Sequence, residues 1–246
     1  MCAVTDLSHT TTMVVGASRG LGRGIAVAFA DAGAPVIAVA RTPGIDGSGL
    51  QTEVADAADA TVAGALLDRH EPAALILVAG AGPLLRPLQH QTWETFSVNW
   101  QTDVRVSFHW LREALLKPLA PGTRVVVISS GAALAGSPLS GGYAGAKATQ
   151  RFMTEYAQAE ADRAGLGLTF TVVLPRLTPL TRLGRPAVQD YAARSGRTEE
   201  EYLREQGESL SPEIAGGAVL ELVRADAAAV AGQSYLLTAG GLRKLT

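Results

Sequence analysis

Cysteine and aromatic residues are scarce in this chain of 246 residues. The one cysteine, Cys2, excludes a disulfide within the chain and a zinc site built from cysteines. Aromatic residues make up 5% of the chain, although hydrophobic residues in total make up 47%. We therefore expect a sizeable core built mainly from Ala, Val and Leu, whose side chains suit close packing of helices on a sheet.

An excess of charge of one sign is also missing, as are long apolar runs. The net charge is −2 and no basic tract stands out, which argues against nucleic-acid binding. No apolar stretch approaches the ~20 residues that span a bilayer, and the first twelve residues do not resemble a signal peptide. The four histidines are scattered without a metal-ligand pattern: His9, His70, His90 and His109. We expect a cytoplasmic protein that needs no metal and binds neither nucleic acid nor membrane.

Short β-rich apolar runs alternate with longer helical patterns. The predicted strands are residues 11–15, 35–40, 74–80, 124–130, 168–175 and 233–238, with a weaker one near 51–54. The predicted helices are residues 21–32, 58–69, 92–116, 142–164 and 212–224, the last with Ser211 as its N-cap. This alternation predicts an α/β fold, a doubly wound and mainly parallel seven-stranded sheet with helices on both faces. The length fits one domain covering residues 1–246.

Residues 176–210 interrupt the alternation with a long insertion after a strand end. The segment is rich in charge and contains Pro179 and Pro186. Long insertions of this kind are often lids or binding loops. A solvated helical excursion is the alternative, and the sequence does not decide between the two.

A glycine-rich turn joins the first predicted strand to the first predicted helix. Glycines at 16, 20 and 22 allow a tight turn and let the backbone approach a pyrophosphate, which then meets the helix N-terminus. The strand–turn–helix setting is the one that a dinucleotide-binding, Rossmann-type fold requires. The cofactor-binding residues predicted in this turn are Gly16, Ser18, Arg19, Gly20, Leu21 and Gly22.

The end of the second predicted strand indicates which dinucleotide binds. An acidic residue at this place would bind the ribose hydroxyls of NAD, but the chain has Ala40 followed by Arg41. Two guanidinium groups, those of Arg19 and Arg41, suit a 2′-phosphate instead. The sequence therefore predicts NADP(H), unless Arg41 merely faces solvent.

Tyr143 and Lys147 stand four residues apart in a predicted helix, and Ser130 ends the strand that precedes it. Residues spaced by four share one face of a helix. A nearby ammonium favours the phenolate, so we expect Lys147 to lower the pKa of Tyr143 from its ordinary value of about 10. Together with Ser130 at a strand's carboxyl end, the pair predicts an acid–base centre for carbonyl or alcohol chemistry.

These motifs resemble those of the short-chain dehydrogenase/reductase family over nearly the whole chain. The glycine turn, Asn99, Ser130 and the Tyr143–Lys147 spacing match the family pattern in order. Ala79-Gly80-Ala81-Gly82 stands where the family has Asn-Asn-Ala-Gly, so two asparagines are missing. Pro175 is followed by Arg176 where the family has Pro-Gly, and Arg176 either contacts an anionic substrate group or faces solvent.

The resemblance implies hydride transfer between nicotinamide and a carbonyl carbon. Its implied catalytic residues are Asn99, Ser130, Tyr143 and Lys147, and its further cofactor contacts are Tyr143, Lys147, Ala81, Gly82, Pro175 and Thr178, with Thr181 as the alternative to Thr178. Tyr143 would exchange the proton, Ser130 would position the substrate oxygen, and Lys147 would bind the nicotinamide ribose. Asn99 would hold a proton path to bulk solvent through its carbonyl and a water.

The most favoured function is that of an NADP(H)-dependent ketoreductase acting on a small-molecule carbonyl or alcohol. Imine or enoyl reduction on the same scaffold, or a non-catalytic NADP sensor, are the alternatives. The Tyr–Lys spacing argues against enoyl reduction, for which the family uses a wider gap. The resemblance also implies a homodimer or homotetramer built on residues 92–116 and 142–164.

Overall fold

The computed structural model describes residues 10–42, 49–117 and 119–246. Cys2 and His9 therefore lie outside the described residues. The strands form one sheet in the order β3-β2-β1-β4-β5-β6-β7-β8, in which all neighbours are parallel except the antiparallel pair β7–β8. The strand order reverses direction between β1 and β4, which is where ligands bind in doubly wound sheets.

The strands are β1 (Thr12–Val15), β2 (Val36–Ala40), β3 (Leu50–Val54), β4 (Ala74–Leu77), β5 (Arg124–Ile128), β6 (Thr169–Pro175), β7 (Ser234–Thr238) and β8 (Gly241–Lys244). The main helices are α1 (Gly20–Asp31), α2 (Val62–His70), α3 (Trp93–Asn99), α4 (Arg105–Leu116), α6 (Gly141–Arg163) and α9 (Pro212–Arg224). Short helices lie between them, among them η1 (Leu88–His90), α5 (Ala132–Ala135) and α10 (Ala227–Val230).

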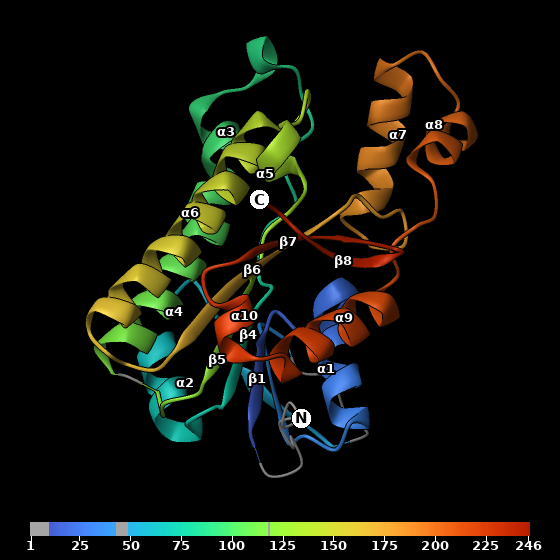
Figure 1. The fold of residues 1–246 in the computed structure, drawn as a ribbon. Coiled ribbons are helices and arrows are strands. Elements are labelled where there is room, and N and C mark those ends of the chain that lie inside the picture. Colours follow the sequence, from blue (N-terminus) through green and yellow to red (C-terminus); the bar gives the residue numbers. More distant parts are fainter. Residues whose placement is uncertain (1–9, 43–48, 118) are drawn as a thin grey trace.

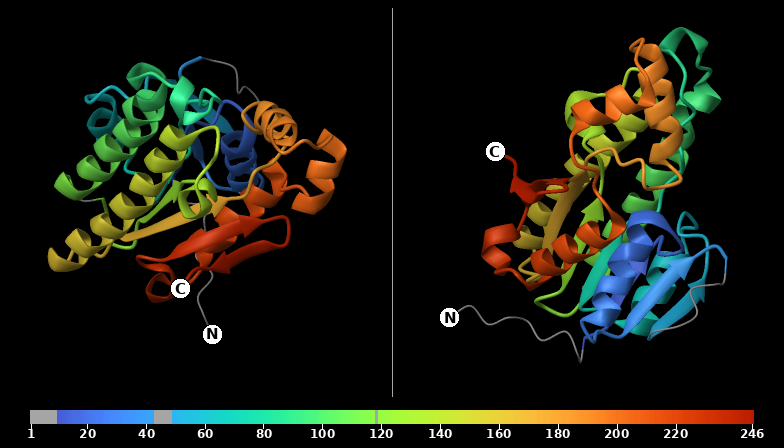
Figure 2. Two further views of the ribbon diagram at one scale, coloured as in Figure 1. Left: turned by 90° about the horizontal axis from the view of Figure 1, so that it is seen from above. Right: turned by 90° about the vertical axis from the view of Figure 1, so that its right-hand side faces the viewer.

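Helices cover both faces of the sheet (Figures 1 and 2). On one face, Ile25 and Phe29 of α1 and Val219 of α9 pack against alternate residues of the central strands. On the other, Leu66 of α2 and Trp110 of α4 belong to a second apolar cluster that includes α6. The central strands are buried along their whole length, as continuous apolar runs predict. The predicted fold class is thus confirmed.

The sheet has eight strands rather than the seven that the sequence predicts. The additional strand, β8, pairs antiparallel with β7 through a tight turn in which Gly241 has a φ of +97°. This strand has four residues that are partly or fully exposed, as is common at a sheet edge. A four-residue strand with two basic residues carries no continuous apolar run, so the pattern that revealed the other strands could not reveal this one.

The helix predicted over residues 92–116 is interrupted. It divides into α3 and α4, which are separated by a π-helical turn, η2 (Trp100–Val104). The wider turn lies where Asn99 and Asp103 both direct polar atoms at the backbone of Ala81. Such π turns are frequent at functional sites, and apolar periodicity alone does not reveal them.

The insertion at residues 176–210 contains two helices, α7 (Gly184–Arg194) and α8 (Glu199–Gln206), which stand apart from the main helical layers (Figure 1). Thr198 caps α8 by accepting a hydrogen bond from the N–H of Glu201. The next helix, α9, has the bounds that the sequence predicts, and its N-cap Ser211 accepts from the N–H of Ile214 at 3.2 Å.

Candidate active site

One cavity of about 1060 Å³ lies at the carboxyl ends of the central strands. It is the place where open parallel sheets bind ligands. The predicted site residues that line it are Gly16, Ser18, Arg19, Gly20, Leu21, Gly22, Arg41, Ala81, Ser130, Tyr143, Lys147, Pro175 and Thr178. Asn99 and Gly82 are the two predicted residues that do not line it.

Two glycines of the glycine turn, Gly16 and Gly22, form a cradle that has no room for a side chain at either position. A Cβ on Gly22 would lie 2.2 Å from the carbonyl oxygen of Gly16, and a Cβ on Gly16 would lie 2.5 Å from the nitrogen of Ala79. Gly16 also has a φ of +95°, which side chains disfavour. Because α1 begins directly at Gly20, its free N–H groups lie at this turn. The geometry fits a dinucleotide whose pyrophosphate meets a helix N-terminus.

Two exposed arginines line the same end of the cavity. Arg19 immediately precedes α1, and Arg41 follows the last residue of β2, Ala40. Neither forms an ion pair with a carboxylate among residues 10–42, 49–117 and 119–246. Both guanidinium groups are thus available to an anionic ligand at this end.

The acid–base candidates meet at the opposite side of the cavity. Tyr143 and Lys147 lie one turn apart on α6, with Lys147 Nζ 5.5 Å from the centre of the Tyr143 ring. Ser130 follows β5, and its Oγ accepts a hydrogen bond from the N–H of Ala132 at 3.2 Å. The neighbouring Ser129 donates to the carbonyl of Lys147 at 2.7 Å, which ties the end of β5 to α6.

The pKa of Tyr143 differs from the value that the sequence suggests. Burial raises it above its ordinary value, and Lys147 and the Ser130 hydroxyl offset only part of that rise. The expectation of a lowered pKa is therefore wrong for this structure. The spacing identified the ammonium but could not reveal either the desolvation of the phenol or a carboxylate nearby, that of Asp103, which raises the tyrosine pKa further.

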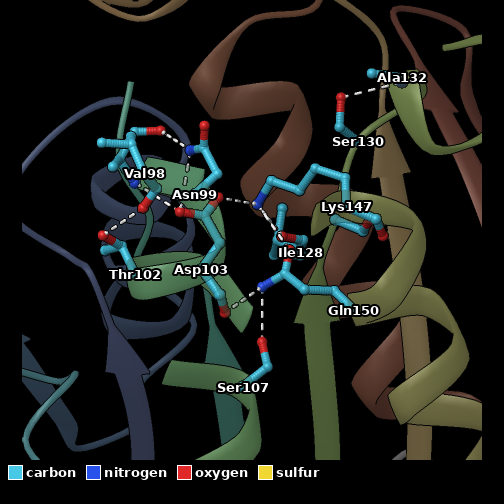
Figure 3. Close-up of polar contacts among 12 residues, drawn as sticks. Val98, Asn99, Thr102, Asp103, Ser107, Ile128, Ser130, Ala132, Lys147 and Gln150 are labelled. Atoms are coloured by element: carbon cyan, nitrogen blue, oxygen red, sulfur yellow. Dashed lines mark hydrogen bonds and ion pairs between the residues drawn. The ribbon is translucent and has the colours of Figure 1, made fainter. Parts of the chain in front are cut away.

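Asp103 is the residue that sequence reasoning missed. It lines the cavity from η2, and its Oδ2 lies 3.1 Å from Lys147 Nζ, with the two side chains 1% and 6% exposed. Burial opposes the charged ammonium, but the carboxylate of Asp103 and the phenol of Tyr143 together outweigh burial, so the pKa of Lys147 is raised. Gln150 completes the setting by accepting from Lys147 Nζ at 2.8 Å (Figure 3). An aspartate within an otherwise ordinary helical pattern gave no signal of this contact.

Asn99 lies behind the cavity wall, 2% exposed. Its amide donates to the carbonyl of Ala81 at 2.7 Å, and the N–H of Ala81 donates to Asp103 Oδ1 at 2.8 Å. Both polar backbone groups of Ala81 are therefore satisfied, although the two asparagines expected at positions 79 and 80 are absent.

Of the two threonines considered for the cofactor carboxamide, Thr178 is buried and donates its hydroxyl hydrogen to the carbonyl of Leu210. Thr181 lies over the glycine turn, since a Cβ on Gly20 would be 3.7 Å from its methyl group. The segment between β6 and α7 thus closes over the cavity and is anchored by Thr178.

The helices of the insertion form the remaining wall. Tyr191 of α7 contacts the hydroxyls of Ser137 and Ser140, the latter at 3.1 Å. Arg176 lies at the end of β6, and its guanidinium donates to the side-chain oxygen of Gln206 in α8 at 3.0 Å. Both residues line the same cavity as Tyr143. The sequence singled out the segment but not Tyr191.

Neither a metal centre nor a membrane span was found in the described part of the chain. No group of three or more His, Cys, Asp or Glu residues there is placed to hold a metal ion. None of the helices described is both long and apolar enough to cross a bilayer.

A parallel sheet with a glycine cradle and a Ser–Tyr–Lys set on one cavity defines a nicotinamide-dependent oxidoreductase of the Rossmann type. The model of the short chain dehydrogenase family matches residues 10–192. The chain belongs to the short-chain dehydrogenase family, whose members bind a nicotinamide cofactor and act on small molecules.

Solved structures share the fold. A 3-oxoacyl (acyl-carrier-protein) reductase from Agrobacterium tumefaciens C58 with NADP bound is 26% identical, with 97% of this chain and 96% of that one covered and a TM-score of 0.78. A short chain dehydrogenase from Mycobacterium avium is 24% identical, with 96% and 85% covered and a TM-score of 0.76. An aldohexose dehydrogenase from Thermoplasma acidophilum is 20% identical, with 95% and 94% covered and a TM-score of 0.80. The search among curated proteins gave no match.

Proposed function

We propose that this protein is an NADP(H)-dependent ketoreductase, which transfers a hydride between nicotinamide and a carbonyl or alcohol substrate. The observation that carries the proposal is the meeting of Ser130, Tyr143 and Lys147 on one cavity with the glycine cradle. The cofactor supplies the hydride, and the chain supplies orientation and the proton. The similar reductase with NADP bound supports the choice of cofactor and of reaction.

Each side chain has a distinct role in this proposal. Tyr143 donates a proton to the substrate oxygen during reduction and accepts one during oxidation. Burial raises the pKa of Tyr143, so the phenol is protonated at neutral pH and can donate its proton during reduction. Ser130 orients the substrate oxygen, and Lys147 holds the nicotinamide ribose. Asn99 holds a proton path from Lys147 to bulk solvent through its backbone carbonyl and a water, while its side chain donates to the Ala81 carbonyl.

The phosphorylated cofactor is favoured by the charge at the adenosine end of the cavity. Arg19 and Arg41 present two guanidinium groups there, and no acidic residue directly follows β2. A 2′-phosphate would pair with both groups, whereas the free hydroxyl of NAD would leave them without a counter-charge. The role of cofactor ligand is therefore assigned to both arginines, with the glycine turn, Ala81, Gly82, Pro175 and Thr178 as the other contacts.

The substrate wall favours a carbonyl compound that carries a negative charge. Three arginines of the insertion line the cavity, namely Arg176, Arg182 and Arg194, and no carboxylate of that segment lines it with them. The backbone of Arg176 lies beside Gly131, the residue after Ser130, because a Cβ on Gly131 would lie 3.8 Å from the Cα of Arg176. Its described side-chain hydrogen bond goes to a neutral amide, that of Gln206, so its charge is free to pair with a substrate.

Assembly is proposed on the outer surface of α4 and α6. Phe108, Phe152 and Tyr156 are 51%, 64% and 57% exposed there, an unusual concentration in a chain with few aromatic residues. Covering them would remove apolar area from water, which favours a homodimer or homotetramer. Light scattering should show a dimer or tetramer for the wild type and a smaller species for Phe152→Glu, with unchanged circular dichroism.

The proposed reaction is tested by following NADPH oxidation with a panel of ketones, imines and activated alkenes. The proposal expects turnover with ketones and an alcohol product. Turnover confined to imines or alkenes would favour the alternative reductases. Tight NADPH binding with no turnover on any compound would favour a sensor.

A further inference from the structure

Gly80 and Asp103 occupy each other's space. A Cβ on Gly80 would lie 2.8 Å from Asp103 Oδ2 and 3.0 Å from its Cγ and Oδ1. Gly80 does not have a positive φ, so its backbone would accept a side chain, and the carboxylate is the obstacle. An asparagine at position 80 and an aspartate at position 103 therefore exclude one another. The space that a side chain at position 80 would take is filled by the carboxylate of Asp103, which reaches Lys147.

A carboxylate suits this position better than any neutral side chain. Oδ1 accepts from the N–H of Ala81 at 2.8 Å and from the amide of Asn99 at 3.3 Å, while Oδ2 faces Lys147 Nζ at 3.1 Å. Donors thus approach both oxygens. The amide of an asparagine has one oxygen and one NH₂ group, so one side would always place donor against donor.

Resting on the proposed function, we propose that Asp103 is a positioning residue, which holds the protonated Lys147 at the cavity wall beside Tyr143. Lys147 Nζ is also held by Gln150 Oε1 at 2.8 Å, and Gln150 in turn donates to Ser107 at 2.6 Å and to the Asp103 carbonyl at 3.1 Å (Figure 3). The ammonium is fixed by a buried network that begins and ends at Asp103. Such a network is stable only while every member keeps its partner.

The charge of Asp103 also acts on the acid–base group. The titratable groups that face Tyr143 are Lys147 on its own helix, Asp103 on η2 and Tyr191 on α7. The carboxylate of Asp103 favours the neutral phenol, whereas the ammonium of Lys147 favours the phenolate. Removing the carboxylate while Lys147 stays protonated should therefore make Tyr143 more acidic.

The first test measures kcat/KM for alcohol oxidation against pH in Asp103→Asn and in the wild type. We expect kcat/KM to fall about tenfold or more, because a charge-assisted contact in the buried network is lost. We also expect the acid limb of the profile to move to lower pH by roughly one unit. The matched control is Thr149→Val on α6, because Thr149 does not line the cavity and donates to the carbonyl of Gly145 at 3.0 Å, so the profile should stay unchanged.

A fall in activity with an unchanged pH profile would reduce Asp103 to a structural residue and overturn the inference. The proposed function fails separately, if Tyr143→Phe keeps its activity. An inactive Tyr143→Phe together with an unaltered Asp103→Asn would leave the proposed reaction standing and remove only the role of Asp103.

The second test needs no catalytic assay and remains valid if Asp103→Asn is poorly active. Gly80→Ala should lower Tm by roughly 3–10 °C in the wild type, because the new methyl group meets the carboxylate. On an Asp103→Ala background the same change should cost much less. An equal loss in both backgrounds would show that the two positions do not exclude one another.

Discussion

The two walls that enclose Tyr143 are built on different principles. On the α6 side, Lys147 is 5% exposed and contacts Asp103, Gln150 and the end of β5. On the insertion side, Arg176 is exposed and hydrogen-bonds to Gln206 on a peripheral helix. The buried wall is held by several contacts within the protein, whereas Arg176 has one such contact and is open to solvent. In the proposed function, the buried wall therefore determines the type of reaction and the exposed wall determines the choice of substrate.

The largest effect is expected on the buried wall, in Tyr143→Phe. The variant keeps the ring and loses the proton, so turnover should fall by about 10²–10⁴. NADPH affinity, measured by fluorescence titration, should change little because the glycine cradle is untouched. Full activity of this variant on a verified substrate would remove the proposed mechanism.

A smaller effect is expected at the adenosine end, in Arg41→Asp. Replacing a cation with an anion beside a 2′-phosphate should raise the Kd for NADPH by roughly 10- to 100-fold and leave that for NADH within a few-fold. Isothermal titration with both cofactors measures this. Equal affinities of the wild-type protein for NADPH and NADH would contradict the cofactor assignment.

On the exposed wall, Arg176→Gln should affect substrate binding and leave the chemistry intact. KM for a β-keto acid should rise about tenfold while kcat changes little, since one charge-assisted contact is lost. The corresponding neutral ester is the matched substrate, and its KM should not respond. Equal responses for acid and ester would show that Arg176 does not bind the substrate charge.

The smallest effect is expected outside both walls, in Ser211→Ala. Ser211 caps α9 but does not line the cavity. Loss of the cap should lower the free energy of unfolding by about 0.5–2 kcal/mol, measured by urea denaturation, with kinetic constants unchanged. A large change in kcat or KM would mean that the cap of α9 and the active site are coupled, although Ser211 lies outside both walls.

The sequence predicts most strands and helices well because the patterns that mark them lie within short stretches of the chain. Continuous apolar runs mark the buried strands, and Ser211 followed by Pro212 marks the start of α9. The glycine turn is predictable for the same reason, since Gly16 and Gly20 have positive φ angles and Gly22 has no room for a Cβ beside the carbonyl of Gly16. The apolar pattern does not reveal β8, because it is a short, polar edge strand whose pairing depends on β7.

The site is less predictable wherever a contact joins residues that are distant along the chain. Asp103 and Lys147 are brought together by the packing of η2 on α6, and only the folded chain shows that Gly80 makes room for the carboxylate. The sequence predicts the wrong direction for the pKa shift of Tyr143 for the same reason, because burial is a property of the whole structure. Tyr191 likewise reaches the site only through the position of α7.

The central claim is that the chain transfers a hydride from NADPH to a carbonyl carbon. It is tested most directly by turnover of a ketone with NADPH that carries deuterium at both C4 positions, followed by mass spectrometry of the product. The account predicts an alcohol with one deuterium on the carbinol carbon, formed by the wild type and not by Tyr143→Phe. A product without deuterium, or one formed equally by both proteins, would contradict it.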